Sequence, residues 1–153
     1  MPTREAEGED MDKEQIVRTA LEMIRAGRPF LLATVDENNA PQMRWMGGSV
    51  LDEPLTVWMA CGATSRKIAQ IRANPAAQLL YSDEKFAKTV TISGRAEAVD
   101  CAEAKQRLWE AMPMLSHHMS GPDDVGFGVV KFVGTRVELL GMAEGMATEV
   151  AEL

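Results

Sequence analysis

Hydrophobic and polar residues follow two different periods along this chain, and these periods predict where helices and strands lie. Apolar residues recur at helical spacing over residues 12–26, where Asp12 and Gln15 form a capping pair and Gly27 follows the last turn. Runs typical of strands come next, and short turns join most of them. The expected strands are residues 30–35, 41–50, 55–61, 77–82, 89–99, 126–133 and 135–140.

Two further helices are expected between the strands. The first covers residues 65–74 and stops before Pro75. The second covers residues 101–112 and starts with a capping pair formed by Asp100 and Glu103. Repeated parallel winding is disfavoured, because only one pair of strands is taken to have a helix between them and that helix is short.

Hairpin-connected strands with helices beside them predict an α+β fold built around an antiparallel barrel. Gly94 lies inside the long strand 89–99, and a glycine there favours a bulge or bend that lets a sheet curl toward closure. No strand is followed by Gly-x-Gly-x-x-Gly, so a Rossmann dinucleotide site is not predicted.

One folded domain with a polar tail at each end is the expected organisation. Residues 1–11 are acidic and predict a disordered N-terminal tail. Residues 12–141 form the domain, and no internal repeat or linker divides it. Residues 142–153 are rich in Ala, Met and Glu and predict a C-terminal tail that is a frayed helix.

Composition and charge exclude several classes of function. The net charge of −7 predicts an acidic surface, which repels nucleic acid and anionic lipid. No apolar run approaches the roughly 18 residues that a membrane span needs. Cys61 and Cys101 have no ligand spacing, which argues against a zinc site and predicts a reducing, cytoplasmic location.

Two cations fall where a helix disfavours them. Arg66 and Lys67 lie in the first turn of the expected helix, after an N-cap at Thr64 or Ser65. The amino end of a helix carries partial positive charge, so these side chains are locally unfavourable. A bound anion would reverse this, because backbone N–H groups, hydroxyls and both cations would converge on one phosphate. The alternative is that both side chains simply extend into water.

Several short segments occur in a characteristic order over residues of about 12–140. The most specific are Ser65-Arg66-Lys67 with Asn74-Pro75, followed by Ser93-Gly94-Arg95-Ala96-Glu97; the others are residues 30–35, Asp36-Glu37-Asn38-Asn39-Ala40-Pro41, Arg44-Trp45-Met46, Gln70-Ile71 and Leu79-Leu80-Tyr81. This order resembles the pyridoxine 5′-phosphate oxidase-like FMN-binding split barrels, and within them the general-stress-protein branch. The resemblance implies a six- to seven-stranded antiparallel split β-barrel with flanking helices.

The resemblance also implies a homodimer with FMN at the subunit interface. By position, Arg44 and the start of the short helix would hold the FMN phosphate, with Thr64, Ser65, Arg66 and Lys67 as the contributing residues. This implication agrees with the anion site suggested by charge.

Contacts to the flavin ring follow from the same resemblance. The backbone of Trp45 and Met46 would run along the flavin, and Met59 and Ala60 would lie near the ring. Thr89 matches a family position that hydrogen-bonds the isoalloxazine. A catalytic residue is not assigned, because no nucleophile–base pair is recognisable and a flavin would itself supply the redox reactivity.

The expected activity is electron or hydride transfer between a reduced donor and a small acceptor. Vitamin-B6 oxidases carry an Arg- and His-containing segment near the C-terminus, and the segment from Glu138 here has no such cations, which argues against vitamin-B6 oxidation. One alternative is a non-enzymatic flavin-binding or stress-response protein. Another is a barrel that binds the deazaflavin F420 or haem instead, for which the available residues are Arg72, Lys85, Lys88 and Arg95 (F420) and His117 or His118 (haem).

Overall fold

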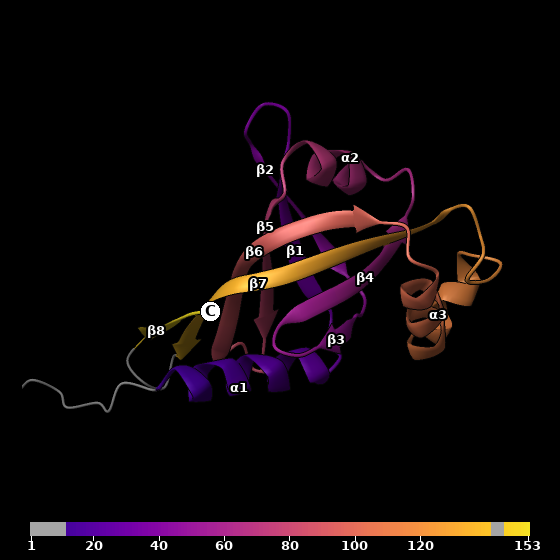
Figure 1. Cartoon of the computed structure of the whole chain (residues 1–153). Helices are drawn as coiled ribbons and strands as arrows, with labels where there is room; N and C mark the ends of the chain where they lie inside the picture. The colour runs from indigo at the N-terminus through magenta and orange to yellow at the C-terminus, as the bar shows by residue number, and fades with distance from the viewer. Residues whose placement is uncertain (1–11, 142–145) are drawn as a thin grey trace, which may run out of the picture.

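The computed structural model describes residues 12–141 and 146–153, and it confirms the α+β fold (Figure 1). Helices flank an antiparallel sheet. The elements in chain order are α1 (Lys13–Arg25), β1 (Phe30–Val35), β2 (Pro41–Met46), β3 (Val50–Asp52), β4 (Thr56–Gly62), α2 (Arg66–Ala73), β5 (Ala76–Ser82), β6 (Lys88–Val99), α3 (Ala102–Ala111), the 3-10 helix η1 (Pro113–His117), β7 (Phe127–Gly141) and β8 (Ala147–Glu152).

Within residues 12–141 and 146–153 the sheet has eight strands rather than six or seven, in the order β2-β1-β5-β6-β7-β4-β3, with β8 also paired to β7. β2 and β3 stand at opposite ends of this order although only residues 47–49 separate them. The sheet must therefore curl round to bring its two edges near each other. No ladder joins β2 to β3 within the described residues, so the barrel remains split between them. In Figure 1, α1 and α2 lie at opposite ends of the barrel.

The predicted strand 41–50 is wrong as a single strand. β2 ends at Met46 and pairs with β1, whereas β3 begins at Val50 and pairs with β4. The change of partner breaks the strand at the two glycines between them. A Cβ built on Gly48 would lie 3.1 Å from Cε of Met112, so the segment between β2 and β3 passes close to the end of α3. β3 extends to Asp52, so residues 53–55 make the turn to β4.

The strands expected over 126–133 and 135–140 are one continuous strand, β7. Gly134 continues the strand instead of ending it, because its backbone N–H donates to the Leu55 carbonyl at 2.9 Å and a Cβ there would lie 2.6 Å from Leu55 Cδ2. The bulge predicted at Gly94 is confirmed, since the register between β6 and β7 shifts between Ser93 and Gly94. A Cβ on Gly94 would lie 2.1 Å from the Val133 carbonyl oxygen, so close backbone approach requires glycine here.

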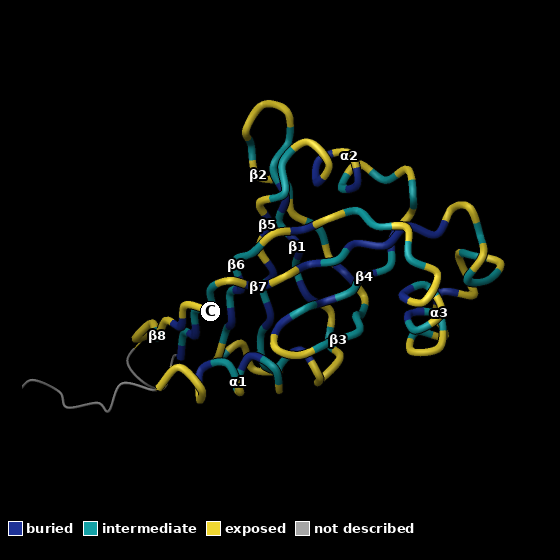
Figure 2. The backbone as a smooth tube through the Cα atoms, viewed as in Figure 1, coloured by how far each residue is buried: buried dark blue, intermediate teal, exposed yellow. Residues whose placement is uncertain are grey.

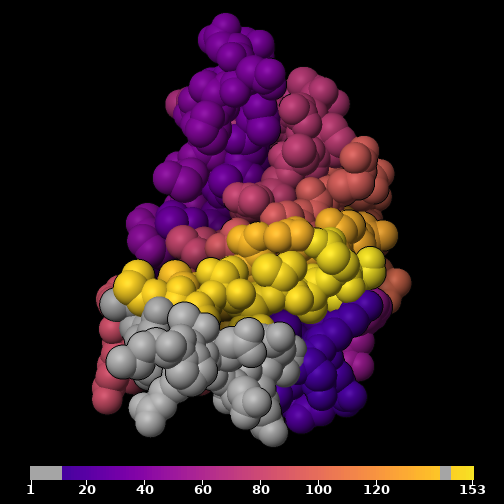
Figure 3. Space-filling model, turned by 90° about the vertical axis from the view of Figure 1, so that its left-hand side faces the viewer, coloured from indigo at the N-terminus to yellow at the C-terminus, as the bar shows by residue number. Residues whose placement is uncertain are grey.

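The C-terminal residues correct another expectation. Residues 147–152 form strand β8, paired with β7 from Arg136 to Gly141, where a frayed helix was expected. Figure 3 shows the C-terminal residues, in yellow, as a band along the surface beside α1, and α1 contacts both β7 and β8. The acidic segment 1–11 and residues 142–145 lie outside the described residues.

Helix ends agree with the sequence in two of the three helices. Asp12 caps α1 as expected, and its carboxylate accepts from the Gln15 N–H at 2.8 Å. α2 starts after Ser65 and ends at Asn74, also as expected. α3 has no side-chain cap, because it begins at Ala102 and Cys101 holds the N-cap position; the Asp100 carboxylate, expected to cap the helix, accepts from Lys105 Nζ at 3.0 Å.

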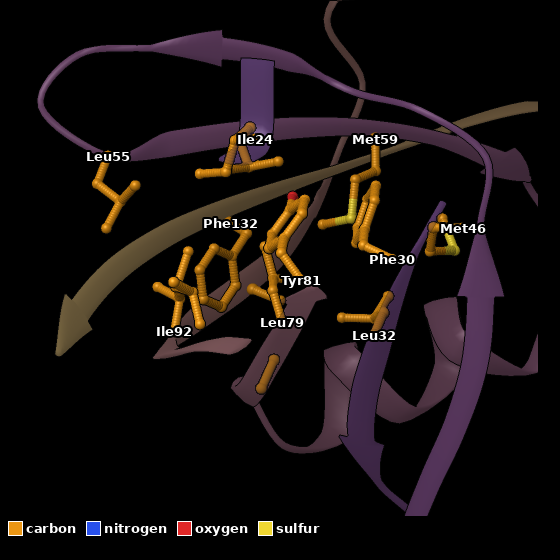
Figure 4. Close-up of a cluster of buried hydrophobic side chains, with 14 of the residues drawn as sticks. Ile24, Phe30, Leu32, Met46, Leu55, Met59, Leu79, Tyr81, Ile92 and Phe132 are labelled. Carbon is orange, nitrogen blue, oxygen red and sulfur yellow. The ribbon is translucent and has the colours of Figure 1, made fainter. Parts of the chain in front are cut away.

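Inward-facing strand residues fill the barrel, and the buried positions concentrate there (Figure 2). Figure 4 shows this core, in which side chains from α1, β1, β4, β5, β6 and β7 meet. A second apolar cluster lies under α3 and centres on Leu108 and Phe127. Among the described helices, none combines the length and apolar character needed to cross a bilayer.

Candidate functional site

The two faces of β2 have an unusual distribution of residues. Met43 and Trp45 are 69% and 67% exposed, whereas Arg44 is half-buried. Successive strand residues point to opposite faces, so Arg44 faces away from the two apolar side chains, as the alternation predicts. The guanidinium thus lies on the α2 side of an edge strand.

Neutral oxygen atoms surround the buried part of this guanidinium. Arg44 Nη1 donates to Thr34 Oγ1 at 2.7 Å and, at longer range, to the carbonyls of Gln42 (3.1 Å) and Leu32 (3.3 Å). Arg44 Nη2 donates to Gln70 Oε1 at 2.8 Å. These hydrogen bonds fix the side chain, yet none of the acceptors carries a charge.

The positive charge of Arg44 is consequently not compensated. Burial, followed by repulsion from the nearby Arg66, lowers the pKa of Arg44 below its usual range. Among the described residues, no carboxylate lies within 4.0 Å of a cationic nitrogen of Arg44, Arg66 or Lys67. In a chain of net charge −7 this local excess of cations favours an anion.

The start of α2 supplies further groups to the same region. Arg66 Nη2 donates to Gln42 Oε1 at 3.3 Å, which places Arg66 beside β2. Ser65 has the backbone conformation of an N-cap, but its side chain makes no capping bond. Its Oγ is buried without a hydrogen-bond partner among the described residues. Such an orphan hydroxyl at a helix amino end lacks the partner that buried polar groups normally have.

Lys67 faces the end of β4. Burial raises the pKa of the Cys61 thiol, and the charge of Lys67 and the hydroxyl of Ser65 offset part of this effect. The residues predicted for a phosphate therefore lie around one corner, with Arg44 and Arg66 on the β2 side and Lys67 on the β4 side. Thr64 is exposed just ahead of the helix.

Residues predicted near a flavin ring are more dispersed. Met46 and Met59 are buried in the barrel core, and the side chain of Ala60 lies on the opposite face of β4, against the α3 cluster. Thr89 pairs with Ser82 and Leu140 at the start of β6, whereas Arg95 lies at the α2 end of that strand. Thr89 and Arg95 are six residues apart along β6, which corresponds to about 20 Å. Thr89 therefore lies far from the corner between β2 and α2 of its own chain.

Sequence reasoning missed Thr34 and Gln70. A signal for Thr34 existed, because alternation along β1 puts it on the same face as Phe30 and Leu32, where a polar residue needs a partner. Gln70 lies beside Ile71 on the buried face of α2. Nothing in the local pattern indicates that these two side chains meet Arg44, because three separate elements bring them together.

A family model described as pyridoxamine 5′-phosphate oxidase matches residues 16–141. A search of curated proteins found no match.

Solved structures of similar fold include general stress protein 26 from Bacillus anthracis str. Sterne, with 20% identity and a TM-score of 0.74 over 94% of this chain and 100% of that one. An FMN-binding protein related to pyridoxamine 5′-phosphate oxidase, from Nostoc punctiforme PCC 73102, has 16% identity and a TM-score of 0.66 over 90% and 94%. A heme-binding protein from Mycobacterium smegmatis has 16% identity and a TM-score of 0.70 over 93% of this chain and 58% of that one. At sequence identities this low, the similarity to these solved structures establishes the fold alone.

Proposed function

This chain belongs to the pyridoxamine 5′-phosphate oxidase family, and we propose that it is a flavoprotein that binds FMN non-covalently. The observation that carries the proposal is the half-buried guanidinium of Arg44, whose acceptors are all neutral. A similar fold in a protein named as FMN-binding supports it.

The corner between β2 and α2 fits a flavin phosphate. A phosphate group needs cations and hydrogen-bond donors that converge. Arg44, Arg66 and Lys67 would supply the charge, while the orphan Ser65 hydroxyl and the first N–H groups of α2 would supply further donors. FMN, when bound, supplies reversible electron or hydride transfer, and the protein binds it, orients it and limits access to it.

We also propose that the working form is a homodimer. Strand pairing aligns Trp45, Leu31, Leu80 and Thr91 in one row across the outer face of the sheet; Trp45 is exposed and the other three are half-buried. The exposed indole of Trp45 lies at the edge of the row, and a second copy of the chain would cover it. The flavin contact implied for Thr89 also favours two chains, since this residue lies far from the phosphate corner of its own chain.

The proposed activity is transfer of electrons or hydride from a reduced donor to a small acceptor. A non-enzymatic flavin-binding protein has the same binding site but no turnover. Haem is the second candidate ligand, because one similar structure is named as heme-binding. FMN takes precedence over haem, because both candidate axial ligands, His117 and His118, are exposed and adjacent.

Titration of the purified protein with FMN, followed by flavin absorbance and fluorescence, tests the proposal. We expect saturable binding at micromolar FMN or below, and about tenfold or greater weakening in the double variant Arg66→Ala/Lys67→Ala, because charge-assisted contacts are lost. The control Lys13→Ala/Arg72→Ala removes the same charge from exposed sites and should bind FMN as the wild type does.

Absence of FMN binding by the wild type would refute the proposal, and a Soret band in the isolated protein would favour haem. An unchanged affinity for FMN in Arg66→Ala/Lys67→Ala would refute the proposal that these residues hold the phosphate. Oxidation of a reduced nicotinamide by the FMN-loaded protein, with a flavin or quinone acceptor, distinguishes an oxidoreductase from a non-enzymatic binder.

A further inference from the structure

We propose that Gln70 is a positioning residue that holds Arg44 as a phosphate receptor and so sets a preference for phosphorylated over unphosphorylated flavin. This inference rests on the proposed FMN binding. It concerns a residue outside the groups proposed to hold the phosphate, which acts through Arg44.

Three side chains form a closed triangle of hydrogen bonds. Arg44 Nη1 donates to Thr34 Oγ1 at 2.7 Å, Thr34 Oγ1 donates to Gln70 Oε1 at 2.7 Å, and Arg44 Nη2 donates to the same Gln70 oxygen at 2.8 Å. Thr34 and Gln70 are 1% and 8% exposed, so neither can exchange these partners readily for water. The triangle locks the orientation of the guanidinium on three elements, β1, β2 and α2.

The locked orientation leaves one edge of the guanidinium available. Thr34 and Gln70 occupy the edge formed by the two terminal nitrogens, Nη1 and Nη2. Arg44 Nε has no acceptor among the described residues, and it is absent from the buried atoms that lack a partner, so solvent reaches it. The edge formed by Nε and Nη2 is one that binds phosphate through two parallel hydrogen bonds.

A neutral amide at position 70 matters for this role. A carboxylate in the same place would also accept from Arg44 and Thr34, but it would neutralise the guanidinium and compete with a phosphate. Glutamine supplies the acceptor without the charge. Gln70 therefore orients Arg44 and keeps its positive charge available to an anion.

Comparison of FMN with riboflavin isolates this effect, because riboflavin lacks the phosphate. The ratio of the riboflavin to the FMN dissociation constant is measured by fluorescence titration at fixed ionic strength. It is determined for the wild type, Gln70→Met, which removes the acceptor at similar volume, and Gln70→Glu, which keeps an acceptor and adds charge. Gln106→Met is the matched control, since Gln106 is exposed on α3 and binds Glu110, away from the corner and from the proposed dimer face.

We expect the FMN preference to fall about tenfold or more in Gln70→Met and in Gln70→Glu, with the riboflavin constant within twofold of the wild type. Arg44→Met should lose the same preference, and Gln70→Met should add little to it, because both changes act on one interaction. The control should keep the wild-type ratio. If Gln70→Met does not fold, as judged by circular dichroism, Gln70→Glu carries the test.

Two results separate the proposals. A wild type that binds neither flavin would remove the FMN proposal and this inference with it, whereas one that binds both equally would remove the phosphate corner and this inference. A wild type that prefers FMN, with Gln70 variants that keep the ratio within twofold or lose both flavins equally, would overturn the role of Gln70 alone. The role of Gln70 would also be overturned if the effects of Gln70→Met and Arg44→Met on the ratio were fully additive in the double variant.

Discussion

Arg107 on α3 binds Asp52 on β3 through two hydrogen bonds, Nη1 to Oδ2 at 2.9 Å and Nη2 to Oδ1 at 2.6 Å. Trp58 on β4 adds a third, from Nε1 to Asp52 Oδ2 at 2.9 Å. The pair therefore ties α3 to the β3–β4 edge of the barrel. The hydrogen bonds from Arg107, aided by the one from Trp58, lower the pKa of the Asp52 carboxyl below its usual range.

Asp52→Asn should destabilise the protein in a pH-dependent way. Because the pKa of Asp52 is lower in the folded than in the unfolded protein, its contribution is present above about pH 4 and is lost as the pH falls through the lowered value. The side chains of Asp52 and Arg107 are both partly exposed. We therefore expect the substitution to lower the free energy of unfolding by about 1 kcal/mol at pH 7 and by less at pH 3. Urea unfolding at both pH values measures this difference.

Asp123→Asn is the control for this prediction, since Asp123 is exposed and makes no ion pair within the described residues. Its effect on the free energy of unfolding should stay within about 0.5 kcal/mol at either pH. An equal loss at pH 7 and pH 3 in Asp52→Asn would show that the carboxylate charge is not what holds α3.

Tyr81 is the only tyrosine in the chain, and its ring stacks on Phe30 with centroids 4.8 Å apart (Figure 4). It is 2% exposed, and its hydroxyl has no hydrogen-bond partner among the described residues. Burial raises the pKa of Tyr81, and the nearby Ser49 hydroxyl offsets only part of this effect.

Alkaline titration should therefore report unfolding rather than simple ionisation. Below the ordinary tyrosine pKa of about 10 the phenol is neutral in both states, and above it only the unfolded state ionises, so stability is lost as the pH rises. We expect tyrosinate absorbance at 295 nm to appear together with loss of the circular dichroism signal. Tyrosinate absorbance that rises near pH 10 in a folded protein would contradict a buried phenol.

Tyr81→Phe completes this test. The variant lacks the unpartnered hydroxyl, so at pH 7 it should be at least as stable as the wild type. Between pH 10 and 11 it should lose less stability than the wild type does. A clear loss of stability at pH 7 would indicate that the hydroxyl has a partner.

Trp45→Glu should weaken the proposed dimer. The indole is exposed on the outer face of β2, and a carboxylate there would have to be desolvated in an interface. We expect light scattering after gel filtration to find a dimer for the wild type and a monomer for the variant at micromolar concentration. Val125→Glu, in an exposed loop, should remain dimeric. A wild type that is monomeric would refute the dimer itself.

Local chemistry determined much of this structure in advance. The capped helix α1, the strands β1 and β4 and the short helix α2 follow from periods and end signals that act within a few residues. The opposed faces of Arg44 and Trp45 follow in the same way, because strand geometry fixes which neighbours share a face. The cations at the start of α2 also predict an anion site, and this stays a prediction.

Tertiary structure decided what depends on a distant partner. Residues 147–152 become a strand because the far half of β7 offers them an unpaired edge, and the strand predicted over 41–50 breaks because its two parts pair with different strands. Met59 faces the barrel core and Trp58 faces the other side of β4, because the pairing of β4 with β7 sets which face of β4 turns inward. Gln70 meets Arg44 only when α2 packs on β1, since the hydrogen bond joins residues that lie 26 positions apart and no local rule relates them.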